Sequence, residues 1–262
     1  MSLAIGCTNS KKLIGHIPGM ENKMHYVCRW QGDRMELIDS VSTDSKGDFS
    51  VKLPGNLRGV IMVTRKSEFG FKSDINDPIN TQTIFLLSDN TDIEFKAYWG
   101  YYSENLKVTS GSKAYEKSRV ISKITTPISR RYHEIRQRLI GFPEDSIMNN
   151  NLVADYRFQY KKMEEEAEKL FENISEKSAL RTYYSLMKPP YIESVRQPGS
   201  LFSGIRYDDD NILNFPEFYY RFKYAFKEEK PDKNNQDSLL SVLRPSPKNR
   251  KGLQEIINNI NQ

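Results

Sequence analysis

The stretch Asp44-Ser45-Lys46-Gly47-Asp48-Phe49-Ser50-Val51-Lys52-Leu53 decides the fold class of the N-terminal half. Its first five residues favour a turn, and Gly47 can take the positive φ that a tight turn needs. After the turn, apolar and polar residues alternate from Phe49 to Leu53, so one face of the segment would be buried and the other wet. The stretch therefore predicts a tight turn that leads into a half-buried β-strand.

Similar short apolar segments, separated by polar turns, occur on both sides of this stretch. They lie at Lys12–Ile17, Met24–Trp30, Met35–Val41, Val60–Val63, Ile84–Leu87, Ile93–Ala97 and Leu106–Val108. Seven or eight short strands at this spacing are typical of a sandwich or barrel. We therefore expect an antiparallel β-sandwich or open barrel over residues 11–110, after a disordered lipoprotein-like N-terminus over residues 1–10.

From Gly111-Ser112 onward the apolar period changes from 2 to 3.6, which indicates helices. The predicted helical stretches are Ile128–Leu139, Leu152–Leu170, Leu180–Met187, Phe215–Phe226 and Leu253–Ile260, with a polar loop at 229–237. Pro127 should kink or break the first helix near Thr126. Ser246 and Pro247 have the residue types of a helix start. The chain is thus predicted to be α+β, with a helical domain over residues 111–262.

Most of the excess positive charge of the chain lies at the start of this helical part. The net charge is +5, and eight basic residues lie between Lys113 and Arg138 against two acidic ones. A helix of this composition could follow phosphate groups. Because no base-reading motif accompanies it, we favour a solvated helix face and expect no nucleic-acid partner. No run of 18 apolar residues is present, so no membrane-spanning helix is expected.

Residues that commonly carry chemistry are few, with three histidines and two cysteines in 262 residues. Cys7 and Cys28 form no CxxC motif, and the sequence predicts a buried, inert side chain for Cys28, facing inward together with Met24, Tyr26 and Trp30. The three histidines are scattered, so each is interpreted as a residue on a strand or helix surface: His16, His25 and His133. We expect no cofactor, metal site or catalytic residue in this chain.

Two clusters could bind ligands. The run Tyr207–Asn211 resembles the opening of a calcium loop but lacks the glycine and glutamate that such a loop requires. We interpret it as a helix start, capped by Asp210 or Asn211. The aromatic residues Trp99, Tyr101 and Tyr102 could stack on a sugar or peptide, or pack between the two halves of the chain, and we favour the second interpretation.

The strand region also resembles a known family. The resemblance is carried by Ile14-Gly15-His16-Ile17, Ile38-Asp39-Ser40, Asp44–Val51, Phe85-Leu86-Leu87 and Val108–Ser112. Together these are similar to an N-terminal β domain of unknown function in exported lipoproteins of Gram-negative gut anaerobes. In that family a helical segment follows, and then a thioredoxin-like module of the thiol-disulfide oxidoreductase or peroxiredoxin type. The resemblance covers residues 11–113, and the module's Trp-Cys-x-x-Cys motif has no counterpart in this sequence.

The first residues agree with the export that this resemblance implies. Leu3 to Cys7 fits a lipobox, in which the cysteine carries the acyl anchor, although no basic region or long apolar stretch precedes it. We expect Cys7 of the native protein to be lipidated and the protein to be anchored to a membrane in the periplasm. The alternative is a disordered terminus with an accidental cysteine.

Two functions remain open on these grounds. The first is the non-catalytic N-terminal part of a membrane-anchored periplasmic thiol-disulfide oxidoreductase, which positions the redox module or its protein client. In that case the chain would be a fragment that omits the module. The second is a stand-alone periplasmic lipoprotein that binds a glycan or peptide. An enzyme in its own right is least favoured, since no nucleophile–base or metal constellation is visible.

Overall fold

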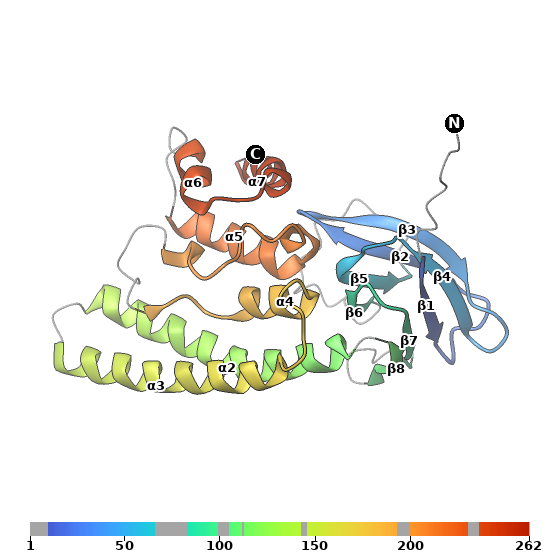
Figure 1. The fold of residues 1–262 in the computed structure, drawn as a ribbon, viewed down its shortest axis with the longest axis horizontal. Coiled ribbons are helices and arrows are strands. Elements are labelled where there is room, and N and C mark those ends of the chain that lie inside the picture. Colours follow the sequence, from blue (N-terminus) through green and yellow to red (C-terminus); the bar gives the residue numbers. More distant parts are fainter. Residues whose placement is uncertain are drawn as a thin grey trace. The chain divides into compact units, whose positions relative to one another are not determined.

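A computed structural model describes residues 10–65, 83–98, 105–111, 113–142, 146–192, 200–229 and 236–261. The chain divides into two compact units, which we call the strand unit (residues 1–115) and the helical unit (residues 116–262). Figure 1 shows strands in the first and helices in the second. The predicted α+β class, with strands before helices, is confirmed.

The described part of the strand unit contains two four-stranded sheets, with strand orders β4-β1-β7-β8 and β3-β2-β5-β6. The strands are β1 (Lys11–His16), β2 (Met24–Gln31), β3 (Arg34–Ser42), β4 (Asp48–Leu53), β5 (Arg58–Thr64), β6 (Thr83–Asp89), β7 (Ile93–Lys96) and β8 (Lys107–Gly111). Each predicted segment corresponds to one of them. One pair departs from the antiparallel expectation, because β1 and β7 run parallel. Alternation indicates which face of a strand is buried and says nothing about its neighbours.

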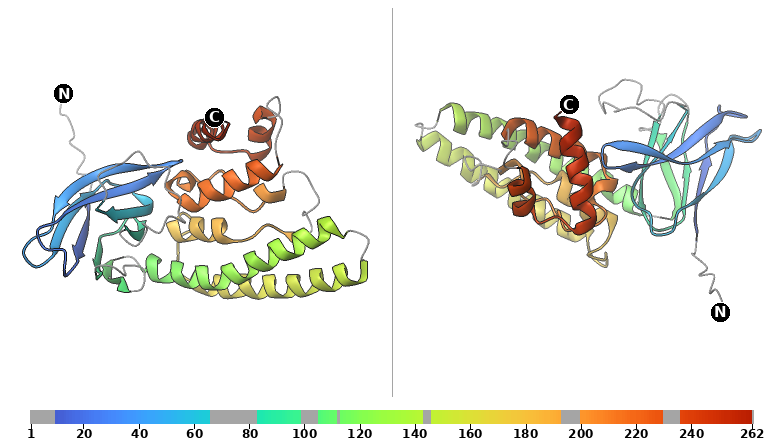
Figure 2. Two further views of the ribbon diagram at one scale, coloured as in Figure 1. Left: turned by 180° about the vertical axis from the view of Figure 1, so that it is seen from behind. Right: turned by 90° about the horizontal axis from the view of Figure 1, so that it is seen from above.

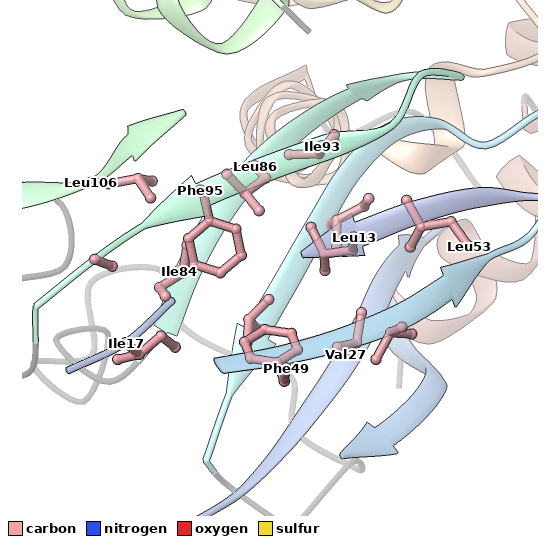
Figure 3. Close-up of a cluster of buried hydrophobic side chains, with 14 of the residues drawn as sticks. Leu13, Ile17, Val27, Phe49, Leu53, Ile84, Leu86, Ile93, Phe95 and Leu106 are labelled. Atoms are coloured by element: carbon pink, nitrogen blue, oxygen red, sulfur yellow. The ribbon is translucent and has the colours of Figure 1, made fainter. Parts of the chain in front are cut away.

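Both sheets contribute to one hydrophobic core, which Figure 3 shows in close-up. In β4, Phe49, Val51 and Leu53 are buried while the residues between them are exposed, as the alternation predicts. These side chains share the core with Val27 of β2 and Ile61 of β5, which belong to the other sheet. The strand unit is therefore a two-sheet sandwich.

The turn before β4 has the conformation that its sequence predicts. The carboxylate oxygen Oδ1 of Asp44 accepts hydrogen bonds from the main-chain N–H of Lys46 (2.7 Å) and of Asp48 (2.9 Å). Gly47 has a φ of 81°. A Cβ atom at this position would lie 2.4 Å from the main-chain oxygen of Ile17. The main-chain N–H of Ile17 also donates a hydrogen bond to the main-chain oxygen of Gly47. The turn thus needs glycine both for its backbone angle and for its contact with the end of β1.

Gly15 in the middle of β1 has a different role. It lies opposite Phe49 on one neighbouring strand and opposite Phe95 on the other. A Cβ atom on Gly15 would lie within 2.2 Å of the Phe49 ring and 2.8 Å of the Phe95 ring. The two rings meet edge to face over this glycine, with centroids 6.0 Å apart. The glycine of the first strand and the phenylalanine of the Asp-x-x-Gly-x-Phe hairpin therefore form one contact in the core.

A bulge in β2 changes the burial that simple alternation predicts. The register between β2 and β3 shifts between Val27 and Cys28, and both of these residues are buried. Cys28 and Trp30 face inward as expected. Met24 is 46% exposed, so its predicted inward position is wrong, and His25 is buried instead of lying on the surface. The reason is that the bulge lets the buried face pass from odd-numbered to even-numbered residues.

In the helical unit, α2 and α3 form a long antiparallel pair in every view (Figures 1 and 2). The described helices are α2 (Ala114–Gly141), α3 (Ser146–Leu170), α4 (Ala179–Met187), η3 (Ser200–Phe202), η4 (Ile212–Asn214), α5 (Pro216–Glu229), α6 (Gln236–Leu243) and α7 (Pro247–Ile260). Pro127 does not break α2, which continues for 28 residues. Ile121 before it and Tyr132 after it are both buried, so packing on either side holds the helix together despite the proline.

The remaining helices follow the predicted pattern with two exceptions. The predicted aromatic stripe is buried, with Phe215 just before α5 and Phe218, Phe222 and Phe226 within it. Ser246 caps α7 by accepting a hydrogen bond from the N–H of Asn249, with Pro247 in the first turn. The apolar spacing in Leu180–Met187 predicts that Tyr183 and Tyr184 belong to the buried face of α4, but both are only half-buried, and Thr182 and Ser185 are buried instead. Helix α6 was not predicted, since the segment before it is polar and the helix has only eight residues.

Candidate functional site

The residues from Ser185 to Pro190, which we call the α4 end segment, are the point where the helical unit is tied together. A helix end leaves several main-chain carbonyl groups without partners, and two prolines prevent the chain from continuing the helix. Here these carbonyls accept bonds from side chains of three other helices. The donors are Ser129 for Met187 (3.4 Å), Tyr160 for Pro189 (3.4 Å), Tyr156 for Pro190 (3.4 Å) and Arg221 for Ser185, Leu186 and Lys188.

Arg221 makes three of these six bonds. Its Nη1 lies 3.1, 3.0 and 2.6 Å from the oxygens of Ser185, Leu186 and Lys188, and its Nη2 lies 2.7 Å from the oxygen of Ser203. The C-terminal end of a helix carries partial negative charge, which stabilises a cation. Burial lowers the pKa of this guanidinium, although the group remains charged at any ordinary pH. Arg221 thus replaces the missing N–H donors at the end of α4.

Lys188, in the same segment, has a carboxylate partner. Its Nζ lies 2.6 Å from Oε1 of Glu164 on α3. Three tyrosine rings surround the ammonium, with centroid distances of 5.4 Å (Tyr160), 6.0 Å (Tyr184) and 5.2 Å (Tyr191). Burial raises the pKa of the Tyr160 and Tyr184 hydroxyls, with a further contribution from Glu164. The rings therefore stay uncharged, and the positive charge of Lys188 is balanced by Glu164.

A cavity of about 240 Å³ lies against the α4 end segment. It is lined by Ser129 and His133 of α2, by the five residues Leu186–Pro190, by Leu201 of η3, and by Arg221 and Tyr224 of α5. The His133 ring meets the ring of Tyr224 edge to face at 5.7 Å. Burial and the nearby Arg136 lower the pKa of His133, while Glu228 opposes them, so the imidazole is mainly neutral near pH 7. The cavity thus combines an apolar wall with the Arg221 guanidinium.

The residues that the sequence singles out do not gather at this cavity, except for His133. Cys7 and the aromatic residues Trp99, Tyr101 and Tyr102 lie outside the described residues. His16 is partly exposed and bonds through Nδ1 to a carboxylate oxygen of Asp48. Cys28 has a free, buried thiol, and burial raises its pKa to about 12. It is therefore inert, as expected.

The acidic run also differs from its prediction. Asn211 precedes the short η4 turn without a side-chain capping bond, and α5 begins only at Pro216. Asp209 is the residue that orders the run: it accepts from the N–H of Asn211 at 2.9 Å and from the hydroxyl of Thr182. The expected cap at Asp210 or Asn211 is therefore wrong, because the carboxylate of Asp209 links the turn to α4 instead. In the part of the chain that the structure describes, no group of three or more potential ligands could hold a metal ion.

The basic part of α2 bonds largely within its own unit. Nζ of Lys117 donates to the main-chain oxygen of Leu170 at 2.6 Å, and Arg136 lies 3.8 Å from the carboxylate of Glu228. Arg131 pairs with Glu134 at 3.1 Å. The first two contacts hold α2 to its neighbours, the third lies within α2, and four further basic side chains are exposed: Lys113, Arg119, Lys123 and Arg130. None of the described helices has the length and apolar character needed to cross a bilayer.

The sequence did not reveal the roles of Arg221 and Lys188. The only available signal was Pro189-Pro190, which predicts a helix end with unpartnered carbonyls. Comparison with known proteins adds no further residues: no family model, curated protein or solved structure matches this chain.

Proposed function

We propose that this chain is the non-catalytic N-terminal part of a membrane-anchored periplasmic thiol-disulfide oxidoreductase-like lipoprotein, in which it positions the redox module or its client. The observation that carries this proposal is the resemblance of residues 11–113. Its motif residues include Gly15, Gly47 and Phe49, and their close contacts show that each has a physical role in the sandwich. The resemblance therefore rests on residues that shape the fold.

The state of Cys28 supports a non-catalytic role. Thiol-disulfide exchange needs an accessible thiolate with a lowered pKa. Cys28 has the opposite properties, since its side chain is fully buried and its thiol pKa is raised. Redox chemistry in the intact protein would then depend on a separate thioredoxin-like module.

The mass of the endogenous polypeptide tests the proposal, measured by immunoblot with antibodies against this chain. A thioredoxin-like module of about 140 residues would add roughly 15 kDa to the 30.5 kDa of the chain. We expect a band near 45 kDa (roughly the sum of the two masses) in the membrane fraction, and mass spectrometry should find an acylated Cys7. A band near 30 kDa would contradict the redox assignment, and an unmodified Cys7 in an intact peptide would contradict the anchor.

The second candidate is a stand-alone periplasmic lipoprotein that binds a glycan or peptide. The cavity beside the α4 end segment favours it, because a concave site with a few polar groups is the usual form of a ligand site. The same immunoblot separates the two candidates, since only the second gives a band near the mass of this chain.

A further inference from the structure

We propose that the cavity of the helical unit binds a small organic carboxylate, with its charged group at Arg221 and its apolar part against the prolines and leucines of the lining. This inference does not depend on the proposed function. It holds whether or not a redox module accompanies the chain.

The first argument is the charge balance of the cavity. Buried charges in proteins are normally paired with an opposite charge. Lys188 has Glu164 at 2.6 Å, and His133 is mainly neutral. Among the described residues, Arg221 is bonded only to main-chain oxygens, and those of them that line the cavity include no carboxylate. Within the described part of the chain, the positive charge of Arg221 is therefore offset by the dipole of α4 alone, and an anion would complete the balance.

The second argument is the unused hydrogen-bonding capacity of Arg221. A guanidinium has five N–H donors. The four bonds to main-chain oxygens involve both Nη1 hydrogens and one Nη2 hydrogen. The Nε–H group and the second Nη2 hydrogen have no acceptor in the described part of the chain. Two such N–H groups on one planar guanidinium can donate to the two oxygens of a carboxylate.

The third argument concerns the rest of the ligand. Half of the lining residues that the structure describes are apolar: Leu186, Met187, Pro189, Pro190 and Leu201. The volume of about 240 Å³ is below the roughly 300–1,000 Å³ of sites for drug-sized molecules. The cavity therefore suits a carboxylate on a body of a few carbon atoms. Such a group is carried by a short-chain acid or by the C-terminal residue of a peptide with an apolar last side chain.

Calorimetric titration of the full chain with butyrate and with butyramide tests the charge requirement. The two compounds have nearly the same shape, and only butyrate is an anion. We expect butyrate to bind at least tenfold more tightly, and equal affinity or no binding of butyrate would overturn the proposal. Titration with N-acetyl-glycyl-leucine distinguishes the two sources: tighter binding than butyrate indicates a peptide terminus, and weaker binding indicates a free acid.

The location is tested by the NMR titration of His133 and by a pair of tryptophan variants. A carboxylate in the cavity should raise the pKa of His133, so its ring signals should titrate at higher pH when butyrate is bound. Met187→Trp fills the cavity and should lower the affinity for butyrate at least tenfold. Met24→Trp, on an exposed residue of β2, is the matched control and should leave it unchanged. If butyrate binds but the pKa of His133 stays unchanged, the ligand lies elsewhere and the proposal is overturned. This outcome can be read even if Met187→Trp fails to fold.

Discussion

Nη1 of Arg221 lies 2.6 Å from the main-chain oxygen of Lys188, a residue 33 positions earlier in the chain. This bond joins the middle of α5 to the end of α4, where the two prolines leave the carbonyl groups without main-chain donors. The same guanidinium serves three carbonyls of the α4 end segment and a fourth one at Ser203, so this side chain makes half of the described side-chain bonds that the segment accepts. The stability of the helical unit should therefore depend strongly on it.

We predict that Arg221→Met destabilises the helical unit by about 3–5 kcal/mol, because several buried carbonyls lose their donor at once. Urea unfolding followed by far-UV circular dichroism would measure the change. Arg250→Ala removes an exposed arginine from α7 and should change the free energy of unfolding by less than about 0.5 kcal/mol. Equal effects of the two substitutions would show that the Arg221 bonds contribute little.

Gly47→Ala should destabilise the strand unit by about 2–4 kcal/mol. The new side chain would clash with the main chain of Ile17, and alanine would also be strained by the positive φ at this position. Gly32→Ala provides the control. Gly32 also has a positive φ, of 64°, but a Cβ atom there would meet nothing within 4 Å. Gly32→Ala should therefore lower the free energy of unfolding by only about 1–2 kcal/mol, which is the cost of the positive φ alone. Thermal unfolding of both variants separates the two contributions, and a Gly32 variant as unstable as the Gly47 variant would refute the clash.

Cys28 should be unreactive in the folded protein. In a Cys7→Ser background, a thiol reagent such as 5,5′-dithiobis(2-nitrobenzoate) at pH 8 should label Cys28 only after urea is added. Since the folded pKa of the thiol is raised to about 12, the stability that this group contributes is fully present below its unfolded pKa of about 8.5. It is lost as the pH rises toward 12. Rapid labelling without urea would disprove the burial.

Glu217 in the first turn of α5 should make the helical unit sensitive to pH. Burial raises the pKa of its carboxyl to about 7, and Oε2 is buried without a hydrogen-bond partner among the described residues. The contribution of the protonated form to stability is fully present below the usual pKa near 4.5 and is lost as the pH rises through about 7.

Glu217→Gln imitates the protonated form, so it should stabilise the protein by about 1–3 kcal/mol at pH 8. The effect should be much smaller at pH 4.5. Urea unfolding at the two pH values checks this, with Glu166→Gln on the exposed face of α3 as the control. A Glu217→Gln variant that is less stable than the wild type at pH 8 would mean that the ionised carboxylate has a favourable partner.

The strands of the sandwich could be predicted because some alternate between a buried and an exposed face, as β4 does, and others are short apolar runs that are buried on both faces, as β5 is. The position of His25 could not, since a bulge opposite β3 changes which residues face inward. The continuity of α2 through Pro127 depends on tertiary packing and not on local preference. The cavity was the least predictable feature, because it depends on Arg221 reaching a helix end that is distant in the sequence.

The position of β1 has a consequence for how the chain folds. β1 is the first described strand, yet it lies between β4 and β7 and pairs in parallel with β7, whose residues begin at Ile93. This pairing can therefore begin only after 80 residues beyond Leu13 have been made, because Leu13 pairs with Ile93. Contacts between residues so far apart in the chain form slowly. During synthesis, β1 must remain unpaired on this side until β7 emerges, and a chaperone that shields apolar strands would act in that interval.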